Sequence, residues 1–94
     1  MITTKGLLTE VEFSKTKENG VIAIGTINQT VTLQQLHSPR TVGSSLLDDT
    51  NNIKELPKIE LNFYNKESVD VLIAALVQIK KNIDNPYNHY ALAC

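Results

Sequence analysis

Residues 7–14 alternate with a period of two, with Leu7, Thr9, Val11 and Phe13 on one face, which predicts a β-strand because successive side chains of a strand point to opposite faces. The segments that follow residue 20 are rich in β-branched residues, which also favour strands. We expect strands over Thr4–Ser14, Val21–Ile27 and Thr30–Leu36. The pair Asn19-Gly20 tolerates the positive φ angles of tight turns and predicts a hairpin between the first two strands. Asn28-Gln29, between the second and third strands, is either a second turn or only a bend.

A fourth strand and a helix are predicted in the last third of the chain. Hydrophobic and polar residues alternate over Lys58–Tyr64, which predicts the strand. Asn65 is suited to cap a helix, because its side chain can accept a hydrogen bond from an unpaired backbone N–H, and Glu67 is favourably placed in the first turn. We therefore expect a helix over Asn65–Ile83, ended by Asn85-Pro86.

One face of the predicted helix is strongly hydrophobic. At 100° per residue, a single stripe is formed by Val69, Leu72, Ile73, Leu76, Ile79 and Ile83, a spacing that packs a helix onto a sheet. Further apolar residues lie outside the stripe, so the hydrophobic surface is wider than a lone helix needs to pack on a small sheet. We expect a second cover, either another copy of the chain or the C-terminal tail. An oligomer interface would use Val71, Ala75, Val77 and Gln78.

These elements predict one α+β domain over residues 1–94, with a three- to four-stranded antiparallel sheet and one long C-terminal helix packed on it. Residues 1–36 would form a β-hairpin or meander, residues 58–64 a strand and residues 65–83 the helix. Residues 37–57 are expected to be a loop with room for one short helix, and residues 84–94 an ordered or semi-ordered aromatic tail. A long irregular segment in so small a domain is usually functional or disordered.

Composition narrows the classes of function. Hydrophobic residues make up 41% of the chain, enough for a core, and nine basic against ten acidic residues give a net charge of −1. Nonspecific nucleic-acid binding is not expected, because it needs a basic surface. No apolar stretch approaches the roughly 20 residues of a membrane span, and the first residues lack a signal-peptide pattern. With the lone Cys94 unable to form an internal disulfide, we expect a cytoplasmic protein.

The loop after the third strand carries the best candidate ligand site. Its imidazole, guanidinium, hydroxyl and backbone N–H groups can converge on an anion such as phosphate. The alternative is a solvated loop with one exposed arginine. The candidate residues are His37, Arg40, Ser44 and Ser45.

The tail offers aromatic groups and little else that is reactive. Tyr87, His89 and Tyr90 would stack on a ligand, or would cover the core without any ligand. The two histidines and Cys94 lack the paired spacings of zinc sites, so no metal or other cofactor is expected. No catalytic constellation is visible, and we expect no enzymatic activity.

The segment from Leu61 through Asn65 to Ile73 resembles the strand, cap and helix of many small phage and prophage accessory proteins. The resemblance implies an anti-defence protein in the host cytoplasm that inhibits a host process by binding. Such proteins include oligomeric sponges that sequester cyclic-nucleotide signals, although no sponge motif carries over to particular residues here. We expect a non-enzymatic homo-oligomeric module that binds a host protein or a small anionic, nucleotide-like ligand. The alternatives are a structural or assembly component and a small hydrolase.

Overall fold

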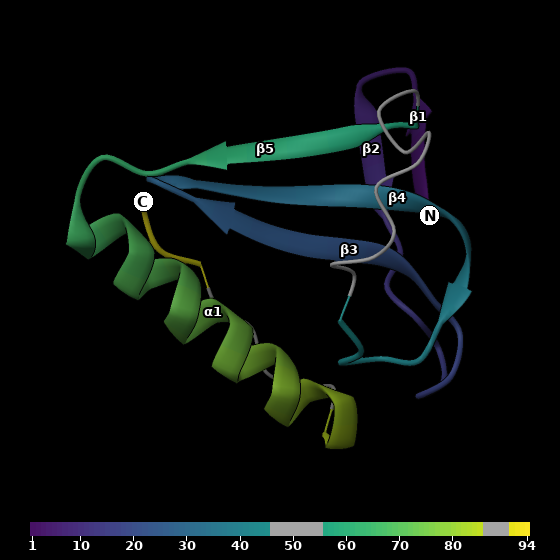
Figure 1. Cartoon of the computed structure of the whole chain (residues 1–94). Coiled ribbons are helices and arrows are strands. Elements are labelled where there is room, and N and C mark those ends of the chain that lie inside the picture. Colours follow the sequence, from purple (N-terminus) through teal and green to yellow (C-terminus); the bar gives the residue numbers. More distant parts are fainter. Residues whose placement is uncertain (46–55, 86–90) are drawn as a thin grey trace. The chain divides into compact units, whose positions relative to one another are not determined.

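The computed structural model describes residues 1–45, 56–85 and 91–94 of the chain. Within them it contains one two-stranded and one three-stranded antiparallel sheet and a C-terminal helix (Figure 1). The α+β class is confirmed. The strands form two separate sheets, where the sequence predicted a single one. The chain forms two compact units, Met1–Asn62 with the strands and Phe63–Cys94 with the helix. The elements are β1 Ile2–Lys5, β2 Leu8–Val11, β3 Gly20–Ile27, β4 Thr30–Arg40, β5 Lys58–Asn62 and α1 Lys66–Asp84.

The predicted single strand over Thr4–Ser14 is wrong, because the chain reverses within it. β1 and β2 pair as an antiparallel hairpin, with Lys5 opposite Leu8. Gly6 stands in the turn with a φ of 58°, a left-handed conformation that glycine adopts without steric cost. The backbone pair Met1 and Glu12 extends the ladder through two further hydrogen bonds. The alternation of residues 7–13 begins inside this turn, so the pattern does not show where the chain reverses.

The predicted hairpin at Asn19-Gly20 is also wrong. Gly20 is the first residue of β3, and β2 pairs with β1 and not with β3. The tight turn lies instead at Asn28-Gln29, between Ile27 and Thr30, where Asn28 has a φ of 52°. Asparagine tolerates this left-handed region better than most residues, which is why the turn forms there.

The three-stranded sheet, in the order β3-β4-β5, has one apolar face. Residues directly opposite each other across antiparallel strands point to the same side. Ile24, Leu33 and Ile59 form one such row, and Thr26, Val31 and Leu61 form the next. We call the apolar face of the sheet the surface made by Ile22, Ile24, Val31, Leu33, Ile59 and Leu61.

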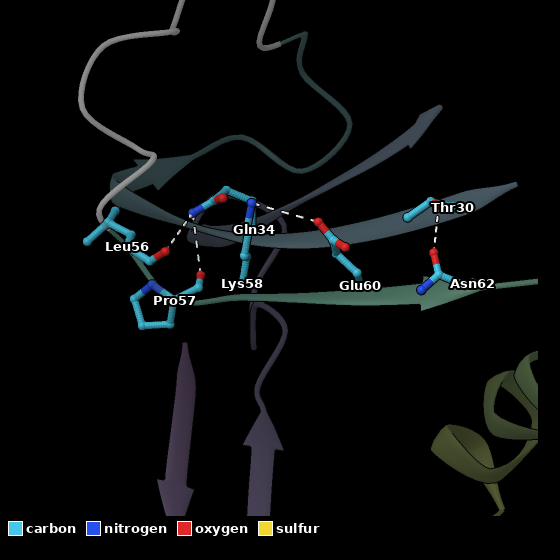
Figure 2. A network of polar contacts seen from close by, with 7 residues as sticks. All are labelled: Thr30, Gln34, Leu56, Pro57, Lys58, Glu60 and Asn62. Carbon is cyan, nitrogen blue, oxygen red and sulfur yellow. Dashed lines mark hydrogen bonds and ion pairs between the residues drawn. The ribbon is translucent and has the colours of Figure 1, made fainter. Parts of the chain in front are cut away.

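The opposite face of β4 and β5 is polar (Figure 2). The Thr30 hydroxyl donates to Asn62 Oδ1 at 2.7 Å, directly across the two strands. Lys58 and Glu60 approach to 3.7 Å on β5, an exposed pair that contributes little stability. The Gln34 side chain donates to the backbone oxygen of Gln35 at 2.9 Å and lies 3.4 Å from the carbonyls of Leu56 and Pro57. These contacts fix the register at the start of β5.

The end of β4 is irregular, and it positions the residues that follow. Between the pairs Ile22–Gln35 and Gly20–Arg40, β3 advances by two residues and β4 by five, so three extra residues bulge from β4. The segment 36–39 contains a proline, which cannot donate to a ladder. The loop predicted to start at His37 therefore starts later, because β4 continues to Arg40. The predicted short helix lies outside the described residues.

The helical unit follows the sequence prediction closely. Asn65 caps α1, with Oδ1 accepting from the Ser68 N–H at 2.8 Å, and Glu67 lies in the first turn. At the other end the Asn85 N–H donates to the Lys81 carbonyl at 2.9 Å, just before the proline. The last described residues return to the first turn, where the Ser68 hydroxyl donates to the Cys94 carbonyl at 2.9 Å. The predicted Asn65 cap and helix are confirmed.

Buried hydrophobic surface is scarce in the described part of the chain. Leu36, 6% exposed, is the single hydrophobic residue there that is buried. No described residue of α1 is buried. Many large hydrophobic side chains remain more than half exposed, among them Ile24, Leu76 and Ile83.

Candidate functional site

A pocket of about 410 Å³ lies in the strand unit, where β3 meets the irregular end of β4. It is bounded by the segment after β2, by β3 and by the loop after β4. Its volume is within the range of small-molecule sites. It is lined by Phe13, Ser14, Gly20, Ile22, Ala23, Ile24, Leu36, Arg40, Thr41, Val42, Gly43 and Ser44.

Local backbone contacts hold the pocket wall in place. The Val42 N–H donates to the Lys17 carbonyl at 2.9 Å, which ties the loop after β4 to the segment before β3. The Ser44 N–H and hydroxyl both donate to the Thr41 carbonyl, at 3.1 and 2.6 Å, and close a turn. Gly43 within this turn has a φ of 88°, a conformation that needs glycine.

Gly20 brings β3 unusually close to the end of β4. A Cβ atom at this position would lie 3.0 Å from the Arg40 carbonyl oxygen and 3.8 Å from the Val42 side chain. Both groups belong to the pocket wall, and the nearer one is backbone that cannot swing away. Glycine at this position therefore permits a close approach of two backbones and does not form the turn that the sequence predicts.

The pocket is apolar at its base and carries one cationic side chain. Leu36 forms the buried part, while Phe13, Ile24 and Val42 are 53–60% exposed and contribute open apolar surface. Arg40 is half-buried and is the one charged residue of the lining. An apolar wall with a single cation matches a ligand that has an apolar body and one negative group.

The hydroxyl protons of the two serines are already used within the protein. Ser14 donates to the Thr16 carbonyl, and Ser44 donates to the Thr41 carbonyl. Their oxygens therefore offer lone pairs to a ligand and not protons. These hydroxyl oxygens therefore suit a hydrogen-bond donor on the ligand.

The predicted ligand residues are only partly brought together. Arg40 and Ser44 both line the pocket, whereas His37 and Ser45 are exposed residues that do not line it. The three predicted tail residues, Tyr87, His89 and Tyr90, lie outside the described residues.

Sequence reasoning misses most of the apolar lining. The alternation pattern places Phe13 on the face of a strand, although it lies beyond the end of β2. Ile22 and Ile24 are correctly predicted on a strand, but the local sequence does not show that they line a pocket. The signal that was available is the proline at position 39 within a β-rich run, which indicates a bulge at that point.

The predicted oligomer residues lie on α1 with different exposures. Val71, Ala75 and Gln78 are half-buried, and the Gln78 amide donates to Asn82 Oδ1 at 3.0 Å on the same helix. Val77 is 46% exposed. Their role in an interface stays a prediction.

Other chemistry is sparse in the described residues. No group of three or more His, Cys, Asp or Glu side chains within them is arranged to hold a metal ion. Cys94 is an exposed free thiol. In residues 1–45, 56–85 and 91–94, no helix combines the length and hydrophobicity needed to cross a bilayer. Comparisons with protein-family models, with curated proteins and with solved structures found no match.

Proposed function

We propose that this protein is a non-catalytic binding module that captures a small amphipathic anion in the pocket between β3 and the end of β4. The observation that carries the proposal is the placement of Arg40, the single charged side chain of the lining, beside an apolar base in a pocket of about 410 Å³. A predominantly apolar pocket with a few placed polar groups is the usual form of a small-molecule site.

The ligand chemistry follows from the lining. One negative group pairs with the Arg40 guanidinium, and an apolar body of aromatic or aliphatic type packs on Ile22, Ile24 and Leu36. A hydroxyl or N–H of the ligand donates to the oxygens of Ser14 or Ser44, whose protons are engaged. A single cation favours a monoanion over a polyphosphate. In the setting implied by the resemblance to phage accessory proteins, capture of such a molecule would deprive a host process of it.

Anilinonaphthalene sulfonate is a suitable probe, because it joins an aromatic body to one sulfonate and its fluorescence rises in an apolar site. We expect saturable binding that octanoate competes away. Arg40→Ala should weaken binding roughly tenfold, since a hydrogen bond to a charged group contributes about 1.5–3 kcal/mol and Arg40 is only half-buried. The binding should also weaken with added salt.

Lys58→Ala is the matched control, because it removes one cation from the same unit at an exposed position outside the pocket lining. It should leave the affinity for the probe unchanged. Equal losses in the two variants would show a nonspecific charge effect and refute the role of Arg40. Absence of saturable binding for both anilinonaphthalene sulfonate and octanoate would refute ligand capture, leaving inhibition of a host protein as the function to test.

A further inference from the structure

We propose that the anion captured in the pocket is the free carboxyl end of an extended peptide, which adds as an antiparallel strand to the outer edge of β3. This inference rests on the proposed function, because it names the class of ligand for the same pocket. β3 is an end strand in the order β3-β4-β5, and no further strand of the described residues pairs with its outer side (Figure 1). A free edge can pair with an extended chain through backbone hydrogen bonds, and adjacent pockets then select its side chains.

The ladder of the sheet determines which groups of β3 point outward. The Gln35 N–H donates to the Pro57 carbonyl at 3.1 Å, so the odd-numbered residues of β4 bond toward β5 and the even-numbered ones toward β3. Ala23 and Gly25 lie opposite even-numbered residues of β4 and therefore use their backbone groups inside the sheet. The backbone N–H and C=O groups of their neighbours point to the open side; these neighbours are Ile22, Ile24 and Thr26.

The outer edge of β3 carries no charge that would oppose pairing. No hydrogen bond in the part of the chain that the structure describes reaches the three outward backbone segments from the open side. The second half of the strand is exposed, with Ile24 at 60% and Ile27 at 70%. β3 has eight residues without a charge or a proline, whereas β5, the other end strand, has five and carries the exposed pair Lys58 and Glu60. Charges and prolines protect strand edges, so β3 is the edge that accepts a partner.

The pocket lies at one end of this edge. It is lined by three consecutive residues of β3, 22–24, whose side chains alternate between the two faces of the sheet. Their inner side is closed by pairing with residues 33–35 of β4, so a pocket that contacts all three runs along the outer edge. Arg40 and the loop residues 41–44 complete the wall beside Gly20, the first residue of β3. The edge therefore ends in a pocket that contains a cation.

The position of Arg40 determines the direction of the peptide. A peptide antiparallel to β3 runs from Ile27 towards Gly20, so its last residue enters the pocket and its carboxylate meets the Arg40 guanidinium. Residues directly opposite each other point to the same side of a sheet. The last residue, opposite Ile22, and the third from last, opposite Ile24, thus place their side chains on the apolar face of the sheet. The expected ligand has apolar residues at these two positions and a free carboxylate.

The test is fluorescence anisotropy of the full chain with a fluorescein-labelled pentapeptide, Gly-Thr-Val-Thr-Val, that ends in a free carboxylate. We expect saturable binding that anilinonaphthalene sulfonate competes away, because both ligands use the same pocket. The same peptide with a C-terminal amide lacks the negative charge and should bind at least about tenfold more weakly.

Proline substitutions test the edge itself, because proline has no N–H to donate and is tolerated where that N–H faces away from the ladder. Thr26→Pro removes one outward N–H and should weaken peptide binding at least about fivefold. Its affinity for anilinonaphthalene sulfonate should stay at the wild-type value, since Thr26 does not line the pocket. Glu60→Pro is the matched control, because it removes an outward N–H from the opposite edge of the same sheet, and it should leave the peptide affinity unchanged.

The outcomes separate this inference from the proposed function. If anilinonaphthalene sulfonate binds and the peptide does not, the inference is overturned and the proposed function stands, whereas absence of binding by the sulfonate and by octanoate refutes the proposed function itself. Equal affinities of the acid and the amide, or equal losses in the two proline variants, would also overturn the inference. So would self-association in sedimentation velocity that Thr26→Pro abolishes, since β3 of a second copy would then occupy the edge.

Discussion

Replacing Leu36 by alanine should destabilise the strand unit more than any exposed truncation of the same size. Leu36 is 6% exposed and is the one buried hydrophobic residue in the described part of the chain. Leucine-to-alanine substitutions in cores cost about 2–5 kcal/mol, and the cost falls when the new cavity can be filled. Leu36 borders the pocket, so water can enter the space, and we expect a value near the lower end, about 2–3 kcal/mol.

The expected loss of stability in Leu36→Ala is a large share of the free energy of unfolding of the whole chain. A chain of 94 residues has an expected free energy of unfolding of about 5–14 kcal/mol. At about 4–8 °C per kcal/mol for a domain of this size, Leu36→Ala should lower the melting temperature by about 8–24 °C. Thermal unfolding followed by circular dichroism measures the shift.

Leu7→Ala is the control, because it deletes the same atoms from a fully exposed side chain in the turn between β1 and β2. Its effect should stay within about 0.5 kcal/mol. If the two substitutions lowered the melting temperature equally, the conclusion that Leu36 carries the buried packing of this unit would be refuted.

Two further substitutions test the local structure. Asn65→Ala removes the side-chain acceptor for the Ser68 N–H and should reduce the free energy of unfolding by about 1 kcal/mol, with a lower helix signal in circular dichroism. Asn65→Asp keeps an acceptor and should restore the signal, which would confirm capping as the cause. An unchanged helix signal in Asn65→Ala would contradict the role of the cap. Gly6→Ala should lower the free energy of unfolding in urea by about 1–2 kcal/mol, because φ is 58° there while no atom lies within 4 Å of the new Cβ. Gly25→Ala is the control, since that position is equally open but has no positive φ, and it should leave the free energy of unfolding unchanged. Equal losses in the two variants would argue against the turn between β1 and β2.

The helix and its cap were predictable because their signals are local. The Asn65 side chain reaches an N–H only three residues away, and each apolar residue of α1 recurs within one turn of the next. Such interactions are encoded in a short window of sequence and depend little on the rest of the fold. The predicted end at Ile83 differs from the observed Asp84 by one residue, within the fraying of a helix terminus.

The strand pairings were less predictable, because period-two alternation does not show where a chain reverses. The alternation of Leu7, Thr9, Val11 and Phe13 begins inside the turn between β1 and β2, so it does not mark the reversal at Gly6, where φ is positive. Asn19-Gly20 has the composition of a tight turn, yet Gly20 is used for close approach to the Arg40 carbonyl. An Asn-Gly pair is thus compatible with a tight turn or with a close approach of two backbones. Which of the two forms at Gly20 depends on Arg40, which lies 20 residues later in the sequence.

Arg40 was predicted as a candidate ligand residue from a setting that differs from the one in the structure. The sequence presents Arg40 as a loop cation beside serines, but it is the last residue of β4, opposite Gly20. It reaches the pocket because three extra residues in β4 displace the end of the strand from the regular ladder. If the ladder continued without interruption from the pair Ile22–Gln35, Gly20 would lie opposite His37, and the loop carrying Gly43 and Ser44 would begin elsewhere. The irregular end of β4 is therefore what brings Arg40 beside the apolar residues of β3 in the candidate site, and a pattern of alternation does not show it.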